Sequence, residues 1–225
     1  MPFVIIIIVI VLAYQAYLKT PKAKGIKGEK MVGAILKKAA LTHGGIELWD
    51  WMVQDDQAAA QVDNLLLTQK ALYVFEVKNY RGRIFGSPTQ LHWTMTLLTS
   101  YTKKTKRGKR VKKTHLSKHR FYNPIMQNQT HIRKLTHVLE GTPTVPIINV
   151  VVFGSKADVS EVSSIKEVVS YRHLMRLIDQ YEASLEVCLS IEDQIDVVDR
   201  LYEADIRDKK ARRAHVKNLR LKYKN

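Results

Sequence analysis

Two carboxylates and one ammonium group are brought close together by a predicted turn near the middle of the chain. Asp63 and Glu76 each lie in a short apolar segment with the residue types of a β-strand. Side chains alternate between the two faces of a strand, so Lys78 is expected on the same face as Glu76. Residues 68–70 are few enough to form a hairpin turn, which would bring Asp63 back beside Glu76. The sequence therefore predicts one patch with two acids and one lysine.

Such a patch has the chemistry of a magnesium or manganese site. Mg²⁺ prefers oxygen ligands, and Mn²⁺ accepts the same donors. We expect Asp63 and Glu76 to ligate the metal, with the carbonyl oxygen of Val77 as a further ligand. Lys78 would orient or activate an attacking water, and the metal would stabilise charge on a phosphate. The predicted reaction is hydrolysis of a phosphodiester bond.

Four short motifs surround these residues in a fixed order along the chain. They are Gly25-Ile26-Lys27-Gly28-Glu29, then Gln61-Val62-Asp63, then Phe75-Glu76-Val77-Lys78-Asn79-Tyr80 followed by Gly82, and finally Asn123-Pro124 with Gln127. Together they resemble the nuclease-related domain, NERD, a branch of the PD-(D/E)xK nuclease superfamily. The resemblance covers residues 25 to about 140. The chain departs from it at Asn64, where many members have histidine, and at Lys70-Ala71, where a glycine often enters the second strand.

The resemblance implies both a fold and a set of site residues. The fold is an α/β core of the restriction-endonuclease type, with a mixed central sheet flanked by helices. The catalytic residues would be Asp63, Glu76 and Lys78, completed by Gln127 and Glu29. For Glu29 a second interpretation stays open, because an acidic residue in the first turn of a helix is also favoured by the helix dipole.

The net charge of +16 is concentrated in two segments. Residues 101–120 carry ten Lys or Arg and no acid, and residues 207–225 have a net charge of +8, so the remaining residues sum to −2. This pattern favours polyanionic partners, either nucleic acid or an anionic membrane face. Of the nucleic acids, we expect DNA as the partner before RNA. Contacts there would be to the phosphate backbone. The candidate nucleic-acid-binding residues are Lys103, Lys104, Lys106, Arg107, Lys109, Arg110, Lys112 and Lys113.

An apolar run at residues 2–18 is interrupted only by the amide of Gln15. As a helix it would be about 25 Å long, slightly less than a typical hydrocarbon core. Five lysines follow within twelve residues of its end, which predicts that the rest of the chain is cytoplasmic. We expect residues 3–18 to form a single-pass anchor in the inner (plasma) membrane, with the soluble domain in the cytoplasm. A buried strand and a cleaved signal peptide are the alternatives.

The predicted organisation has three parts. Residues 1–20 form the transmembrane anchor, residues 21–155 the nuclease-like domain with a basic insertion at 101–120, and residues 156–225 a helical, basic C-terminal extension. The basic insertion is expected to be a projecting hairpin or a disordered loop. Cys188 is the single cysteine, which excludes a disulfide framework, and the eight histidines lack the spacing of a zinc site.

Two other functions fit parts of the same sequence. A non-catalytic nucleic-acid-binding module would use the basic segments but has no need for carboxylates in its groove. A membrane adaptor would use the same segments to contact anionic lipid. The acidic residues favour the metal-dependent nuclease, or a nuclease-like DNA-processing protein, over both.

Overall fold

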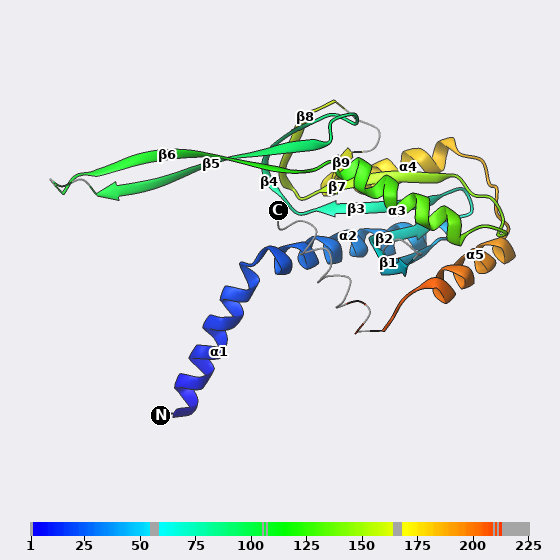
Figure 1. Ribbon diagram of the computed structural model, residues 1–225, viewed down its shortest axis with the longest axis horizontal. Helices are drawn as coiled ribbons and strands as arrows, with labels where there is room; N and C mark the ends of the chain where they lie inside the picture. Colours follow the sequence, from blue (N-terminus) through cyan, green and yellow to red (C-terminus); the bar gives the residue numbers. More distant parts are fainter. Residues whose placement is uncertain are drawn as a thin grey trace.

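The computed structural model describes residues 2–54, 59–104, 106, 108–163, 168–208, 210 and 212. Within these residues, nine strands form two sheets (Figure 1). The first sheet has the order β1-β2-β3-β7-β9 and the second has the order β6-β5-β4-β8. The expected α/β architecture, with mixed sheets and covering helices, is therefore present.

The first sheet is built on the predicted hairpin. Strands β1 (Ile46–Gln54), β2 (Ala59–Leu67) and β3 (Leu72–Lys78) pair antiparallel in sequence. Strand β7 (Ile147–Phe153) then joins β3 in parallel, and β9 (Val168–Ser170) joins β7 in the same way. β7 reads IINVVVF, which is typical of a strand covered on both faces.

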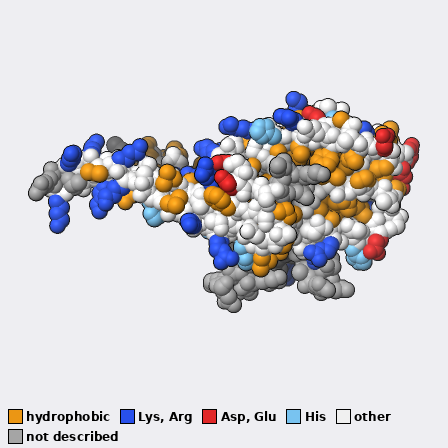
Figure 2. Space-filling view, turned by 90° about the horizontal axis from the view of Figure 1, so that it is seen from above, with side chains coloured by type: hydrophobic (Ala, Val, Ile, Leu, Met, Phe, Trp, Pro, Cys, Tyr) orange, Lys and Arg blue, Asp and Glu red, His pale blue; other side chains and the backbone are white. Residues whose placement is uncertain are grey.

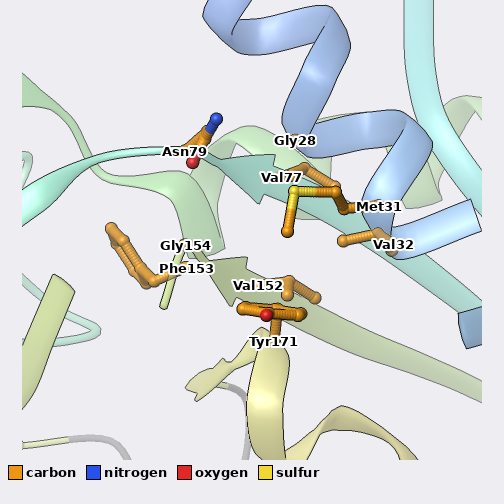
Figure 3. A pocket seen from close by; sticks show the side chains of 9 residues that line it. All are labelled: Gly28, Met31, Val32, Val77, Asn79, Val152, Phe153, Gly154 and Tyr171. Atoms are coloured by element: carbon orange, nitrogen blue, oxygen red, sulfur yellow. The ribbon is translucent and has the colours of Figure 1, made fainter. Parts of the chain in front are cut away.

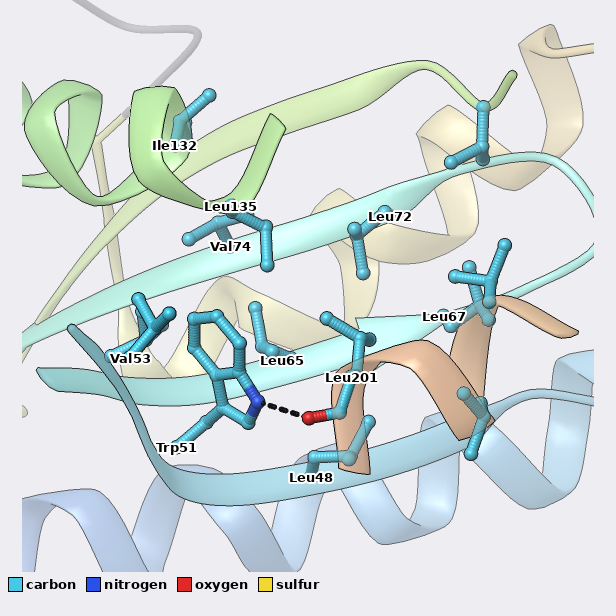
Figure 4. Close-up of a cluster of buried hydrophobic side chains, with 14 of the residues drawn as sticks. Leu48, Trp51, Val53, Leu65, Leu67, Leu72, Val74, Ile132, Leu135 and Leu201 are labelled. Atoms are coloured by element: carbon cyan, nitrogen blue, oxygen red, sulfur yellow. Dashed lines mark hydrogen bonds between the residues drawn. The ribbon is translucent and has the colours of Figure 1, made fainter. Parts of the chain in front are cut away.

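Helices cover both faces of this sheet. Helix α2 (Pro21–His43) and α4 (Leu174–Ser184) pack on the face that carries Tyr73 and Phe75. Helices α3 (Pro124–Val138) and α5 (Ile191–Ala204) pack on the other face. On that face the indole of Trp51 donates a 2.7 Å hydrogen bond to the carbonyl of Leu201, which links the first strand to α5 (Figure 4).

The ends of three helices follow directly from their sequences. Asn123 caps α3 by accepting a hydrogen bond from the Ile125 amide, with proline at the first helical position. Ser190 and Asp193 form a reciprocal capping box at the start of α5. Gly44 ends α2 in the left-handed conformation, with φ of 63°. α2 begins directly after α1, because Thr20 caps it and Pro21 occupies its first position.

The second sheet contains the basic segment. Strand β4 (Arg81–Gly86) pairs with β5 (His92–Lys104) and, in parallel, with β8 (Lys156–Val162). β5 and β6 (Arg110–Tyr122) form thirteen consecutive antiparallel pairs with no shift of register. At the root of this pair Trp93 and Phe121 are buried, but residues 98–104 and 110–120 are exposed. The two strands therefore leave the body as a long ribbon, the first of the two expected forms (Figure 1).

Residues after 155 contribute strands as well as helices. β8 and β9 each extend one sheet, and a short 3-10 helix, η1 (Tyr171–His173), leads into α4. Beyond α5 the chain runs along the free edge of β1, where the Ile206 amide donates to the Met52 carbonyl and Asp205 accepts from the Met52 amide. The basic tail at residues 213–225 lies outside the described residues.

Helix α1 (Pro2–Leu18) bends away from α2 by 71°. Its large apolar side chains from Phe3 to Leu18 are 46–79% exposed. In the described part of the chain, no single helix is long and apolar enough to cross a membrane, although α1 and α2 taken as a bent pair meet that requirement by length and composition. The expected single transmembrane helix is thus not supported in that form.

Candidate active site

The predicted hairpin brings Asp63 and Glu76 to neighbouring positions. The register pairs Asn64 with Phe75, which sets Asp63 and Glu76 beside each other at the next position along the two strands. The Asp63 carboxylate accepts a 2.7 Å hydrogen bond from the backbone amide of Val77. This contact fixes the carboxylate at the C-terminal end of β3.

Lys78 lies between two groups from different elements. Its ammonium donates to Oε1 of Glu76 at 2.6 Å and to Oε1 of Gln127 at 3.0 Å. Glu76 is 3% exposed, so its charge needs a partner inside the protein. Gln127 lies in the first turn of α3, which the Asn123-Pro124 cap starts, and from there its side chain reaches the end of β3. The sequence predicted all three residues as site residues, and the structure brings them together.

His131 also faces the site, which the sequence did not indicate. It follows Gln127 by one helical turn on α3, and its Nε2 lies 3.5 Å from Oε2 of Glu76. The His131 side chain is 12% exposed. Its spacing of four residues from Gln127 was the available signal, because such residues share a helix face.

Glu29 approaches the same site from α2. Burial raises the pKa of the Glu29 carboxyl, and the charges of Asp50 and Glu76 raise it further, while Lys78 lowers it. α2 can lie this close to the end of β3 because Gly28 has no side chain: a Cβ there would stand 2.7 Å from the Cβ of Asn79. Asn79 in turn donates to the Lys24 carbonyl at 2.7 Å. Because α2 begins at Pro21, Glu29 lies beyond the first turn and is not a helix-start acid, and at this position it feels the charge of Glu76.

Asp50 is a second residue that sequence reasoning missed. The strand register places it across from Asp63, and its backbone has φ of 55°, which is uncommon outside glycine. Arg212 forms an ion pair with its carboxylate at 2.8 Å, and Gln61 donates to it as well. An isolated acid between two tryptophans in a strand gave no signal in the sequence.

The ionisation of the three central groups reflects this crowding. Burial raises the pKa of Asp63 well above its usual range, and the charges of Glu76 and Glu29 add to the rise. Burial also acts to raise the pKa of Glu76, but Lys78 and His131 outweigh it and the net pKa is lowered. Burial acts to lower the pKa of Lys78, but Glu76 and Asp63 raise it on balance. The site therefore holds an ionised Glu76–Lys78 pair beside a carboxyl that favours its proton.

Behind the strand end lies a small apolar pocket on the α2 side (Figure 3). Val77 points into it, away from Glu76 and Lys78, as strand alternation requires. No charged side chain lines this pocket, so it has no group to bind a phosphate or a metal. The side chains that line it pack the end of β3 against α2 and η1. Its lining residues are Gly28, Met31, Val32, Val77, Asn79, Val152, Phe153, Gly154 and Tyr171.

The donors at the site suit a magnesium ion that keeps most of its waters. Among the described residues, no three His, Cys, Asp or Glu side chains converge closely enough to enclose a metal. Mg²⁺ is, however, commonly held by one or two carboxylates together with water and substrate phosphate. Asp63 and Glu76 provide two such carboxylates, and their mutual repulsion is what a cation would relieve. The residues present therefore fit Mg²⁺ or Mn²⁺.

The basic residues lie elsewhere, on the ribbon. The exposed candidates are Lys103, Lys104, Lys106, Lys109, Arg110, Lys112 and Lys113, whereas Arg107 lies outside the described residues. Lys118 and Arg120 belong to the same exposed surface nearer the body, and the sequence did not single them out as binding residues. Lys and Arg side chains mark the length of the projection in Figure 2.

Comparison with known proteins agrees with this arrangement. The sequence profile of the nuclease-related domain family matches residues 24–154. This range includes Glu29, the β2–β3 hairpin, the ribbon and α3. A Bacillus anthracis protein described as uncharacterized is 26% identical over 226 residues, covering 98% of this chain and 96% of its own length. No solved structure matches the chain significantly. Since the matched region is more than half of the sequence, the chain belongs to the nuclease-related domain family, NERD.

Proposed function

We propose that the protein is a metal-dependent nuclease that hydrolyses phosphodiester bonds in DNA. The observation that carries this proposal is the position of Lys78, held between Glu76 and Gln127 at the strand end that also carries Asp63. A binding surface for nucleic acid has no physical need for buried carboxylates, which repel phosphate. A hydrolytic site does need them, because they hold a metal and organise water.

Each residue has a distinct role in this proposal. Asp63 and Glu76, with the carbonyl of Val77, would hold Mg²⁺ or Mn²⁺, which when bound stabilises negative charge on the phosphate. Gln127 and His131 restrict how Glu76 and Lys78 can turn. Glu29 adds negative charge from α2 and favours occupancy by a cation.

Lys78 is suited to orient the attacking water. An ammonium group has three N–H donors, and among the described residues two of them point to Glu76 and Gln127. The third is available for a water or for a phosphate oxygen. Because the pKa of Lys78 is raised, the group stays charged and stabilises an anion rather than acting as a base.

The experiment is cleavage of a mixed panel of linear, circular, duplex and single-stranded DNA with Mg²⁺ or Mn²⁺. Wild-type protein should cleave at least one substrate, and a chelator should abolish the activity. Asp63→Asn, which keeps the size of the side chain, should bind the same substrates without cleaving them. Absence of cleavage by wild-type protein of every DNA and of a matched RNA panel would contradict the proposal.

A non-catalytic nucleic-acid-binding module is the second candidate function. It is favoured by the described residues' lack of three converging metal ligands and by the short contact that already engages Glu76 with Lys78. This candidate predicts metal-independent binding and no hydrolysis, so the same panel separates the two.

We also propose that α1 attaches the protein to the inner (plasma) membrane, with the nuclease domain on the cytoplasmic side. Its apolar side chains are exposed, and lysines follow directly after it. Extraction of the membrane fraction tests this attachment. Detergent should release the protein, whereas release by high salt alone would contradict burial of α1 in lipid.

A further inference from the structure

The ribbon formed by β5 and β6 has two chemically different faces. Its thirteen pairs keep one register, so even-numbered residues of both strands share one face and odd-numbered residues share the other. No Asp or Glu occurs from residue 77 to residue 139, so neither face has an acid of its own. The difference between the faces therefore lies in how many cations each one carries.

The even face carries most of the charge. Lys104, Arg110, Lys112, Lys118 and Arg120 lie on it, whereas the odd face has Lys103 and Lys113. At the root of the ribbon the odd face turns inward, since Trp93 and Phe121 are buried there. The even face is thus the outward face of the second sheet from the body to the tip.

The same outward face continues across the sheet onto β4. Lys118 pairs with Thr96, and Thr96 pairs with Arg83, so these side chains follow one another across three strands. Arg81 lies two residues before Arg83 and is also exposed. We keep the name even face for the whole of this surface, although on β4 its residues are odd-numbered because Arg83 pairs with Thr96. Its cations are Arg81, Arg83, Lys104, Arg110, Lys112, Lys118 and Arg120. Among the described residues, the carboxylate that forms an ion pair with it is that of Asp158, which lies 3.4 Å from Arg83.

We propose that the even face binds the phosphates of duplex DNA, with the ribbon lying in the major groove. This inference rests on the proposed function for the nature of the partner. The major groove is about 12 Å wide and admits a two-stranded β-ribbon. The exposed length from Leu98 to Lys104 is about 23 Å at ~3.3 Å per residue, or about two-thirds of a duplex turn of ~34 Å.

A duplex fits the even face better than a single strand does. Proteins that hold single strands stack bases on exposed aromatic side chains. On the projecting part of the ribbon, the described Phe, Tyr or Trp residue is Tyr101, which belongs to the odd face. The exposed aromatic residues of the even face, Phe85 and Tyr122, lie at the root of the ribbon, so its projecting length offers no such ring for a base to stack on. The even face instead offers cations together with the cross-strand pair Leu98 and Leu116, and these groups contact a backbone and a groove without opening the bases.

The position of the ribbon relates it to the active site. β4 begins three residues after Lys78, so the outward face of the second sheet starts next to the catalytic strand end. Figure 1 shows β3 pointing toward the side of the body from which the ribbon leaves. A duplex held along the even face would therefore be anchored at a fixed distance from Glu76 and Lys78.

Two double substitutions of equal charge test this inference in the full-length chain in non-ionic detergent. Lys112→Gln/Lys118→Gln changes the even face, and Lys103→Gln/Lys113→Gln is the matched control on the odd face. Binding of a 20-base-pair duplex and of each separate strand is measured over a range of salt concentrations with chelator present. Chelation makes the result independent of hydrolysis, so failure of the proposed catalysis and failure of this inference are distinguishable.

We expect the even-face variant to bind the duplex about tenfold more weakly, since two exposed ion pairs with phosphate can no longer form. Its slope of log K against log salt should become shallower by about 1.8, or ~0.9 for each phosphate that the protein no longer neutralises. The odd-face variant should change the slope less than the even-face variant does, because its two lysines lie on the other face of the ribbon. Equal effects of the two variants, or tighter binding of the separate strands than of the duplex, would each overturn the inference.

Discussion

The end of β3 and the β5–β6 ribbon both gather charged side chains, but they support them in opposite ways. At the end of β3, Glu76 is 3% exposed and contacts Lys78 and lies near His131. On the ribbon, cations such as Lys112 are exposed, and no acid lies within the ribbon sequence. The charged groups at the end of β3 contact one another, whereas the cations of the ribbon face solvent and are free to contact a partner.

This difference separates two kinds of contribution to function. A buried charge is coupled to folding, because removal of one partner leaves the other without compensation. An exposed charge in water contributes little to stability but attracts a polyanion over a distance. Substitutions at the strand end should therefore change chemistry and stability together, while substitutions on the ribbon should change binding alone.

The largest expected effect is at Lys78. Lys78→Ala should lower the rate of DNA cleavage by about 10²–10³-fold, a typical reduction when one transition-state interaction is removed. Affinity for DNA should remain nearly unchanged, because the ribbon is intact. Cleavage kinetics under single-turnover conditions, with binding measured in parallel, check this outcome.

The control for Lys78→Ala is Lys38→Ala, which removes an exposed lysine from α2. Thermal unfolding of both variants is also needed, because Glu76 loses its buried partner only in Lys78→Ala. If Lys78→Ala unfolds more easily but cleaves at the wild-type rate, Lys78 serves to neutralise Glu76 and has no role in hydrolysis.

Shortening the ribbon should give the opposite result. Replacement of residues 100–114 by Asn-Gly would close Thr99 onto His115 with a two-residue turn. Duplex affinity should fall, and the salt slope should drop by ~0.9 for each phosphate that the shortened ribbon no longer reaches. The free energy of unfolding should change by less than about 1 kcal/mol, since the described residues among those deleted are exposed. A large decrease in stability would show that the ribbon supports the body.

Gly28 tests how closely α2 must approach the strand end. Gly28→Ala places a Cβ 2.7 Å from Asn79, so the helix must shift, at a cost of about 1–3 kcal/mol. Gly25→Ala is the matched control in the same helix, where the new Cβ meets only Oε1 of Glu29 at 3.7 Å. That variant should be more stable than wild type by about 0.5–1 kcal/mol. Chemical denaturation that gives both variants equal stability would contradict the packing argument.

The smallest expected effect concerns Asp63 in the absence of metal. Because its folded-state pKa is raised, the folded protein binds this proton more tightly than the unfolded chain does. This contribution makes stability fall as pH rises from about 4, the unfolded value, through the folded-state pKa. Glu76 acts in the opposite sense, since its pKa is lowered and its contribution is lost as pH falls.

Asp63→Asn should remove the first of these two dependences. At neutral pH without metal the variant should be more stable than wild type, and Mg²⁺ should stabilise the wild type alone. Thermal unfolding between pH 4 and pH 8, with and without Mg²⁺, measures both effects. Stability of wild type that rises throughout this range to the same extent as in Asp63→Asn would contradict the assignment.

Local patterns were sufficient to predict the hairpin and the side chains that it brings together. Strand alternation and a short turn brought Asp63, Glu76 and Lys78 together, and the Asn123-Pro124 cap fixed the start of the helix that carries Gln127. The apolar run of β7 predicted a strand buried on both faces. These features depend on neighbours within a few residues, which a sequence displays directly.

Features that depend on distant partners were missed. His131 is half-buried because α3 packs on β3, and Asp50 joins the site through the pairing of β1 with β2. For the basic segment the sequence left two alternatives, a projecting hairpin or a disordered loop, because its many cations cannot be buried in a core. The thirteen backbone pairs between β5 and β6 make it a hairpin.

The segment that follows α5 has a consequence for self-association. β1 is an outer strand of its sheet, and such a strand offers unpaired amides and carbonyls to any other extended chain. Asp205 and Ile206 occupy those groups at Met52, and Arg212 donates to the carbonyl of Asp50. A chain cut before Asp205 would expose this edge, and two such chains would be able to join their sheets into one continuous structure. The segment that follows α5 therefore prevents other chains from pairing with β1.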